Sequence, residues 1–118
     1  MSRILIVDDE PMIAMLLDDW VNDLGHETLG PSHTISSALA LIETSPPDAA
    51  IIDVSLGSGS GYQVAEVLSE RNIPFVFATG HGKMGLAPRF AGTPILVKPF
   101  NLADVGAALS KMLDGKAP

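Results

Sequence analysis

Acidic residues stand at the ends of two short apolar runs in this 118-residue sequence. Asp8 and Asp9 come directly after residues 3–7, and Asp53 comes directly after residues 49–52. Carboxylates about 5 Å apart repel one another by roughly 3 kcal/mol per pair at an effective dielectric constant of about 20, so a group of them requires a cation. A partly open site with oxygen ligands alone favours Mg²⁺. These aspartates are therefore candidate ligands of a magnesium ion.

Two further polar residues follow apolar runs in the same way. Thr79 comes after residues 74–78, and Lys98 comes after residues 93–97. A lysine ammonium group is a point charge suited to a phosphoryl oxygen, and a threonine hydroxyl can donate a hydrogen bond to another. With Asp53 as the nucleophile and Mg²⁺ neutralising the incoming phosphate, these residues predict a phosphoryl-transfer site where an acyl phosphate forms on Asp53.

The elements that position these residues alternate between strand-like and helical patterns. Pro11 opens a helix that Gly25 ends, and its expected core stripe is Ile13, Leu16, Leu17, Trp20, Val21 and Leu24. Residues 26–30 are a weak strand candidate, and helices are expected near residues 35–42 and 64–71. Asn101 should cap a final helix with the inward residues Leu102, Val105, Leu109, Met112 and Leu113. Residues 83–92 contain two glycines and a proline, which predicts a short or poorly formed fourth helix.

Such alternation predicts an α/β fold with a parallel sheet covered on both faces. In this architecture ligands bind beyond the carboxyl ends of the strands. Each polar residue has a simpler explanation when taken alone, because an aspartate before a Gly/Ser loop and the pairs Thr79-Gly80 and Lys98-Pro99 are ordinary turn chemistry. Their common position at one edge of one sheet favours a functional site.

The composition excludes several classes of protein. The chain has no cysteine, which excludes thiolate metal sites and disulfide chemistry, and its net charge of −7 argues against nonspecific nucleic-acid binding. The apolar runs are far shorter than a membrane span, and no segment resembles a secretory signal. We therefore expect a soluble, cytoplasmic protein without a membrane or nucleic-acid partner. His26 and His33 lack partners at metal-ligand spacing and are expected at the surface.

As a set, these residues resemble the receiver domain of two-component response regulators. The matching features are residues 7–11, Asp53, Gly61, Thr79 and residues 98–100, in the family's order. The resemblance implies a flavodoxin-like (βα)5 doubly wound sheet of five parallel strands in the order 2-1-3-4-5. It also implies phosphoryl transfer to Asp53 from a histidine kinase or a histidine phosphotransfer protein.

The same resemblance implies roles for the metal ligands and identifies a subgroup. Asp9 would bind Mg²⁺ directly, Asp8 would act mainly through metal-bound water, and the Ser55 backbone carbonyl would complete the metal shell. Residues 77–80, Phe-Ala-Thr-Gly, are similar to a signature of stand-alone receivers, some of which act in general stress signalling.

The sequence departs from the common receiver pattern at three places. Ile95 stands where the usual switch has an aromatic residue, Leu56-Gly57 replaces a frequent Met-Pro pair, and the fourth helix has a poor helical sequence. Within the subgroup an aromatic residue often follows Gly80, whereas here His81 follows. We therefore expect that the signal is read by reordering of residues 80–92, with Thr79, Gly80, His81 and Ile95 as the switch residues.

The resemblance spans nearly the whole chain, so we expect residues 1–118 to form a single receiver domain without an output domain. The output would then be a partner protein, and the receiver itself a monomer or weak dimer. Met12, Ala14 and Met15 are expected to project from the first helix and to form, with Pro99 and Phe100, an adaptable apolar surface for a kinase. The alternative is that Met12 and Met15 fill gaps in the core.

Other functions remain as alternatives. The protein is expected not to be a turnover enzyme but a phosphoacceptor that assists its own phosphorylation and dephosphorylation. A phosphatase with an aspartyl-phosphate intermediate would need a second aspartate where Glu10 stands. A flavodoxin-like cofactor binder would need a hydroxyl-rich loop after the first strand, where this chain has acids. A pseudo-receiver or a phosphate sink that competes for a shared kinase is the remaining alternative.

Overall fold

The computed structural model describes residues 2–56, 59–80, 88–90 and 92–114. Five parallel strands form the main sheet: β1 (Arg3–Val7), β2 (Glu27–Ser32), β3 (Ala49–Asp53), β6 (Phe75–Thr79) and β7 (Ile95–Val97). Four helices connect or follow them: α1 (Pro11–Asp23), α2 (Ile35–Thr44), α3 (Tyr62–Glu70) and α4 (Leu102–Asp114). A small antiparallel pair, β4 (Ser55–Leu56) and β5 (Gly59–Ser60), lies between β3 and α3.

The strands are ordered β2-β1-β3-β6-β7, which is the predicted 2-1-3-4-5 order. β1 and β3 pair in register, with Val7 opposite Ile52, and β3 pairs with β6 so that Asp53 lies opposite Ala78. All five residues of β3 are buried, as the continuous apolar run predicted for a central strand covered on both faces. The carboxyl ends of β1, β3 and β6 therefore meet at one edge.

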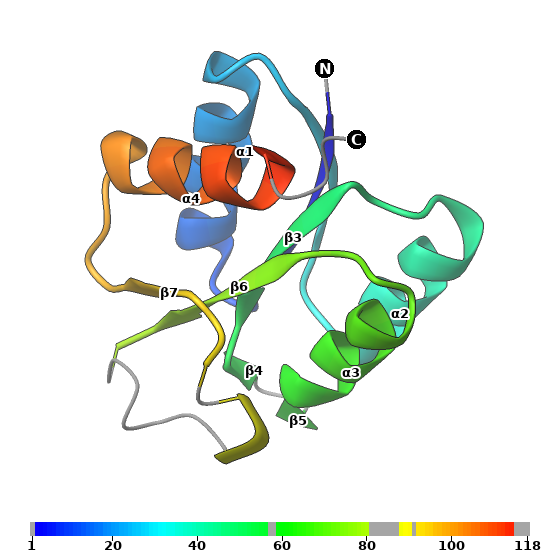
Figure 1. Cartoon of the computed structure of the whole chain (residues 1–118). Helices are drawn as coiled ribbons and strands as arrows, with labels where there is room; N and C mark the ends of the chain where they lie inside the picture. Colours follow the sequence, from blue (N-terminus) through cyan, green and yellow to red (C-terminus); the bar gives the residue numbers. More distant parts are fainter. Residues whose placement is uncertain (1, 57–58, 81–87, 91, 115–118) are drawn as a thin grey trace.

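Helices cover both faces of the sheet (Figure 1). One apolar cluster joins α2 and α3 to the sheet, and a second cluster joins α1 and α4 to the opposite face. Alternate residues of each strand serve the two clusters: Leu5 and Val7 of β1 belong to the first, and Ile4 and Ile6 belong to the second. The doubly wound α/β class expected from the sequence is confirmed.

Local sequence signals set the helix ends. Pro11 occupies the first turn of α1, and Gly25 follows that helix with a φ of +89°, a conformation that disfavours other residues. The Thr34 side chain accepts a hydrogen bond from the Ser37 amide at 3.2 Å at the start of α2. Asn101 and Asp104 cap α4 reciprocally, each side chain accepting from the other's amide at 2.9 and 3.0 Å. The predicted cap at Asn101 is confirmed.

The expected core stripes of two helices need correction. Ala14, Leu17 and Val21 are buried on α1, whereas Leu16 and Leu24 are 43% and 36% exposed. The buried residues follow an i, i+3, i+7 spacing, so the stripe is centred on Ala14 and lies to one side of Leu16. Leu102 was expected to face inward at the start of α4, but its relative exposure is 39%.

An aromatic cluster closes the sheet on the α3 side. Phe90, in a single 3₁₀ turn (Pro88–Phe90), stacks on Tyr62 at 5.1 Å between ring centroids and meets Phe77 edge-to-face at 5.4 Å. Phe75 contacts both Phe77 and Phe90. The predicted fourth helix falls largely on residues 81–87 and 91, which lie outside the described residues. Within the residues that the structure describes, no helix is long and apolar enough to cross a membrane.

Candidate functional site

Three carboxylates converge at the carboxyl edge of the sheet. Oxygen atoms of Asp8, Glu10 and Asp53 all lie within 4.8 Å of one another. The register of the strands explains the meeting of the two aspartates, because Val7 of β1 pairs with Ile52 of β3 and the next residue of each strand is an aspartate. The sequence analysis placed both aspartates at this edge, but it assigned no ligand role to Glu10.

Asp8 is the most deeply buried of these acids, with no exposed surface. Its Oδ1 accepts a hydrogen bond from the Glu10 amide at 2.9 Å, whereas its buried Oδ2 has no hydrogen-bond partner among the residues that the structure describes. Burial and the nearby charge of Asp53 raise the pKa of Asp8 from 3.8 to about 6, although the Glu10 amide and Lys98 oppose the shift. The site thus holds a carboxylate oxygen that its own protein neighbours do not satisfy.

Lys98 brings the opposite charge to the three carboxylates. Its Nζ lies 3.2 Å from Glu10 Oε1, 3.7 Å from Asp53 Oδ2 and 3.8 Å from Asp8 Oδ2. Burial lowers the pKa of Lys98, but Asp8, Asp53 and Glu10 together raise it above its ordinary value. The lysine therefore stays charged and directly faces Asp53, as predicted.

The donor set fits a hard cation. Among the described residues, the possible metal ligands that converge on the site are carboxylate oxygens, and the Oδ2 atom of Asp8 is suited to a metal ion or to a water molecule bound to one. Asp8 and Asp53 are the best-placed ligands of the predicted set. Asp9 is half-buried beside them, and Ser55 begins β4 two residues after Asp53, so their ligand roles stay predictions.

Thr79 reaches the same edge from the neighbouring strand. It ends β6 one position beyond Ala78, the partner of Asp53, and it is 95% buried. Its carbonyl accepts a hydrogen bond from the Lys98 amide at 2.8 Å, which ties the ends of β6 and β7 together. The Asp53 carboxylate, the end of β6 at Thr79 and the Lys98 ammonium group thus lie at the same edge of the sheet.

Gly61 packs directly against the backbone of Asp53. A Cβ atom built on Gly61 would lie 2.3 Å from the Asp53 carbonyl oxygen and 2.8 Å from a methyl carbon of Ile52. The Gly61 amide also donates a hydrogen bond to the Val54 carbonyl at 3.1 Å. Only glycine fits between the end of β3 and the start of α3, which gives a physical reason for this residue of the receiver pattern.

The segment between β2 and α2 buttresses the site from the other side. The Asp8 amide donates to the Ser32 carbonyl at 3.0 Å, and His33 Nδ1 lies 2.9 Å from the Asp8 carbonyl oxygen. Because a carbonyl only accepts, this ring nitrogen carries the proton in this contact. The prediction that His33 is exposed is correct, but its contact with Asp8, 25 residues away, gave no sequence signal.

Only part of the set expected to form a partner surface is exposed. Met12 and Met15 are 77% and 62% exposed, so they do not fill gaps in the core. Ala14 is 1% exposed and belongs to the core stripe, so its assignment to the surface was wrong. Next to these methionines, a groove of about 360 Å³ is lined by Ile13, Leu16, Trp20, Lys98, Pro99 and Phe100. The groove links the exposed face of α1 to Lys98.

The predicted switch residues are distributed along the ends of β6 and β7. Gly80 is exposed directly after β6, and Ile95 is half-buried opposite Phe77 at the start of β7. His81 lies outside the described residues. Trp20, which we expected to pack against the core, contacts Phe100 edge-to-face with 6.3 Å between ring centroids.

Comparison with known families agrees with this fold and site. Residues 4–110 match the family model of the response regulator receiver domain. The chain therefore belongs to the receiver domain family of two-component response regulators, as the sequence predicted.

Particular relatives narrow this membership. The chain is 33% identical to the phyllosphere-induced regulator PhyR of Methylorubrum extorquens over 116 residues, which cover 95% of this chain and 43% of that protein. It thus spans less than half of that curated relative. SdrG from Sphingomonas melonis Fr1 is 45% identical with a TM-score of 0.84, and the match covers 96% of this chain and 97% of SdrG. The BeF3-activated conformation of SdrG from Pseudomonas melonis Fr1 is 46% identical with a TM-score of 0.81, covering 94% and 95% of the two chains.

Proposed function

We propose that this receiver accepts a phosphoryl group on Asp53 from a phosphohistidine of a histidine kinase or phosphotransfer protein. The observation that supports this most directly is the position of Lys98 Nζ, 3.7 Å from Asp53 Oδ2, beside a buried carboxylate oxygen without a hydrogen-bond partner. Lys98 provides a cation for a phosphoryl oxygen, and the carboxylate oxygen of Asp8 provides a ligand for a metal ion. The existence of a BeF3-activated conformation of the relative SdrG agrees with this proposal.

In the proposed reaction a carboxylate oxygen of Asp53 attacks the phosphorus of the phosphohistidine. The phosphorus–nitrogen bond breaks, and its electron pair stays on the departing imidazole nitrogen. Lys98 and the Thr79 hydroxyl hold two of the phosphoryl oxygens as charge develops on them. Glu10 now pairs with Lys98 at 3.2 Å, so it has to release the lysine when the phosphoryl group arrives.

Asp8, Asp9 and Asp53, with the Ser55 carbonyl, would hold Mg²⁺, which supplies the positive charge that the approaching phosphate requires. Before the ion binds, the repulsion among the carboxylates keeps the site unfavourable for a second anion. Asp8 contributes most when it is ionised, because a protonated carboxyl is a poor metal ligand. Its pKa of about 6 therefore predicts that metal binding strengthens as the pH rises through about 6 and levels off above it.

The donor protein is proposed to dock on the exposed face of α1. Met12 and Met15 are flexible, apolar and solvent-exposed, and the groove beside them reaches Pro99, Phe100 and Lys98. An amphipathic helix of the donor laid into this groove would bring its phosphohistidine to the acid edge. The output is proposed to pass to a second protein, with the receiver acting as a stoichiometric carrier and not as a turnover enzyme.

We propose that the signal leaves the site through residues 80–92. Within that range, Phe90 contacts the rings of Tyr62, Phe75 and Phe77. Beyond it, Ile95 stands where the common receiver has an aromatic switch residue. Amide hydrogen exchange with and without a phosphate mimic measures this directly. Unchanged protection of residues 80, 89, 90 and 92 would count against it.

Mass spectrometry of the intact protein tests the phosphoacceptor. Incubation with acetyl phosphate and Mg²⁺ should add one phosphoryl group per chain, and Asp53→Asn should add none. Asp19→Asn is the matched control, because Asp19 lies exposed on α1 and its substitution removes the same charge at a position away from the site. Removing Mg²⁺ with EDTA should abolish labelling of both the wild type and the control.

Two results would contradict the proposal. Labelling of Asp53→Asn at the wild-type level would show that another residue accepts the phosphate. Release of many phosphates per chain from a small phosphate ester would instead identify a phosphatase. Labelling that stops at one group per chain supports the receiver.

A further inference from the structure

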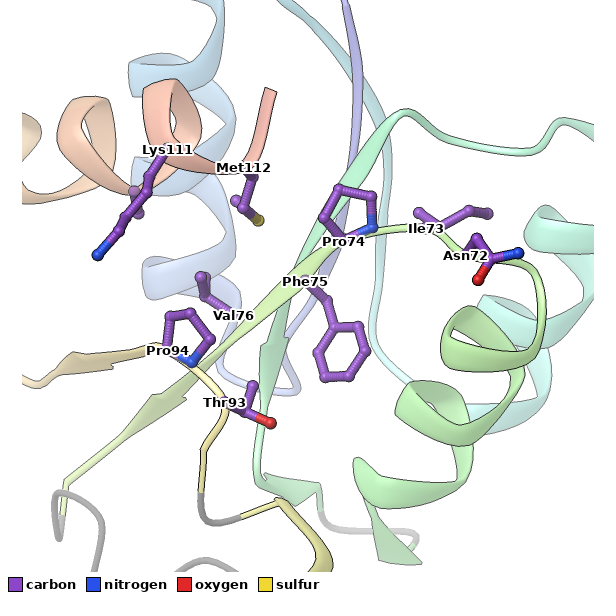
Figure 2. A pocket seen from close by; sticks show the side chains of 10 residues that line it. Asn72, Ile73, Pro74, Phe75, Val76, Thr93, Pro94, Lys111 and Met112 are labelled. Carbon is purple, nitrogen blue, oxygen red and sulfur yellow. The ribbon is translucent and has the colours of Figure 1, made fainter. Parts of the chain in front are cut away.

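A second cavity lies at the opposite edge of the sheet from the acid site. Its volume is about 500 Å³, within the range of small-molecule sites. Figure 2 shows it between the start of β6, the segment that leads into β7, and the last turns of α4. Nothing in the phosphoryl-transfer site uses this cavity, because β6 separates its lining at Phe75 and Val76 from Thr79.

The interior of this cavity is apolar. Ile73, Val76 and Met112 are each at most 8% exposed, and Pro74, Phe75 and Pro94 complete the walls. Met112 is unbranched and can adjust to the shape of a ligand. Removal of the apolar part of a ligand from water into such a cavity is favourable.

One charged group stands among the described residues that line the cavity. Lys111 projects from α4 beside it (Figure 2), and among the described residues the lysine forms no ion pair or side-chain hydrogen bond. The chain has only seven lysine and arginine residues and a net charge of −7, so few positions on it can attract an anion, and Lys111 is one of them. It offers charge complementarity to an anion whose apolar part fills the cavity.

A neighbouring groove sets the direction of such a ligand. This groove shares Val76, Pro94, Ala108 and Lys111 with the cavity and continues along α4 to Asp104. The Asp104 carboxylate would repel an anion at that end. The anionic head is therefore best placed at Lys111, with the apolar body toward Pro74.

We propose that this cavity binds a small monocarboxylate with an unbranched apolar chain of medium length. The carboxylate pairs with the Lys111 ammonium group, and the chain packs against Val76, Pro94 and Met112. A free carboxylate fits better than the headgroups of an anionic membrane, because the net charge of −7 opposes approach to such a surface and a single lysine does not offset it. This inference does not depend on phosphorylation of Asp53.

Titration of the ¹⁵N-labelled protein with decanoate tests the site. Saturable amide shifts are expected for residues 72–73, 75–76, 93, 108 and 111–112, the residues of the cavity lining that carry a backbone N–H group. Shortening the ligand to octanoate should weaken binding about 15-fold, since each buried methylene contributes about 0.8 kcal/mol. Decyltrimethylammonium, with a chain of the same length and the opposite charge, should produce no saturable shifts.

Two variants separate the head from the chain. Lys111→Gln should weaken decanoate binding about fivefold, the usual upper value for an exposed ion pair. Arg3→Gln removes the same charge from β1 outside the cavity and should leave the affinity unchanged. Ala108→Leu places extra carbon in the cavity from a half-buried helical position and should abolish saturable binding, with thermal unfolding as the check that this variant folds.

Several outcomes would overturn the proposal. Absence of saturable shifts with decanoate would show that the cavity binds no such ligand. Equal binding of the ammonium compound, or equal effects of Lys111→Gln and Arg3→Gln, would remove the role of the lysine. Stronger shifts with vesicles of anionic phospholipid than with decanoate would identify a membrane surface as the partner instead.

Discussion

Replacement of Asp8 by asparagine should stabilise the metal-free protein, and more so at higher pH. Asp8 is fully buried, and burial together with the charge of Asp53 raises its pKa from 3.8 to about 6. A carboxyl whose pKa is higher in the folded state binds more protons there than in the unfolded chain. The free energy of unfolding therefore falls as the pH rises from about 4 to about 6, and the full loss persists above that window.

The size of the effect follows from the shift. A rise from 3.8 to about 6 corresponds to about 3 kcal/mol of lost stability at pH 8, and to roughly half of that at pH 5. Asparagine keeps the oxygen that accepts from the Glu10 amide and removes the charge. For a domain of this size, 1 kcal/mol shifts the melting temperature by about 4 °C, so Asp8→Asn should melt about 12 °C higher at pH 8.

Thermal unfolding followed by circular dichroism, in EDTA at pH 5 and pH 8, measures this difference. Asp19→Asn is the control, because Asp19 is exposed on α1 and its replacement should change stability by less than about 0.5 kcal/mol at either pH. Adding Mg²⁺ should then raise the melting temperature of the wild type and narrow its gap to Asp8→Asn.

The reasoning is refuted if Asp8→Asn melts at or below the wild-type temperature at pH 8 without metal. It is also refuted if the gain at pH 5 equals the gain at pH 8, since a pH-independent gain would come from packing and not from the charge of Asp8.

Three further predictions concern positions around the site. Gly61→Ala should lower the free energy of unfolding by more than about 2 kcal/mol, because its Cβ would clash with the backbone of Asp53. Gly106→Ala should be neutral or stabilising, because this position is helical and its Cβ would meet only a leucine side chain at 3.4 Å. Similar denaturant midpoints for the two variants would contradict this. The double variant Met12→Lys, Met15→Lys should change the free energy of unfolding by less than about 0.5 kcal/mol. It should slow phosphotransfer from a donor protein and leave labelling by acetyl phosphate unchanged. Equal phosphotransfer rates for the variant and the wild type would show that the donor does not dock on this face. His33→Ala should lower stability by about 1 kcal/mol and weaken Mg²⁺ binding, which calorimetry would detect, and an unchanged Mg²⁺ affinity would show that the histidine does not support the site.

The strands and their shared edge could be predicted from the sequence because both depend on local pattern. Residues 3–7 and 49–52 are continuous apolar runs, which suit strands buried on both faces, and parallel strands bring the residues that follow them to one edge. Asp8, Asp53 and Lys98 therefore came together as expected. No side-chain detail was needed for this part of the prediction.

The remaining details depend on packing between distant segments. The contacts of Lys98 with Glu10 and of His33 with Asp8 join positions 88 and 25 residues apart, which no local pattern specifies. Ala14 was assigned to the surface because alanine carries little hydrophobic signal, yet its small side chain lies in the centre of the buried face of α1. Leu16 and Leu24 are more hydrophobic than Ala14, so the predicted core stripe of α1 was centred on the wrong residues.

The bare contact between Gly61 and Asp53 has a mechanical consequence. No side chain lies between the Asp53 peptide and Gly61 at the start of α3, so the two backbone segments are in direct contact and are closely packed. A shift of the Asp53 main chain would therefore displace Gly61. The Ala65 amide donates a hydrogen bond to the Gly61 carbonyl at 3.1 Å, so α3 would move together with Gly61. A displacement of the backbone at Asp53 is therefore expected to displace the first turn of α3 as well.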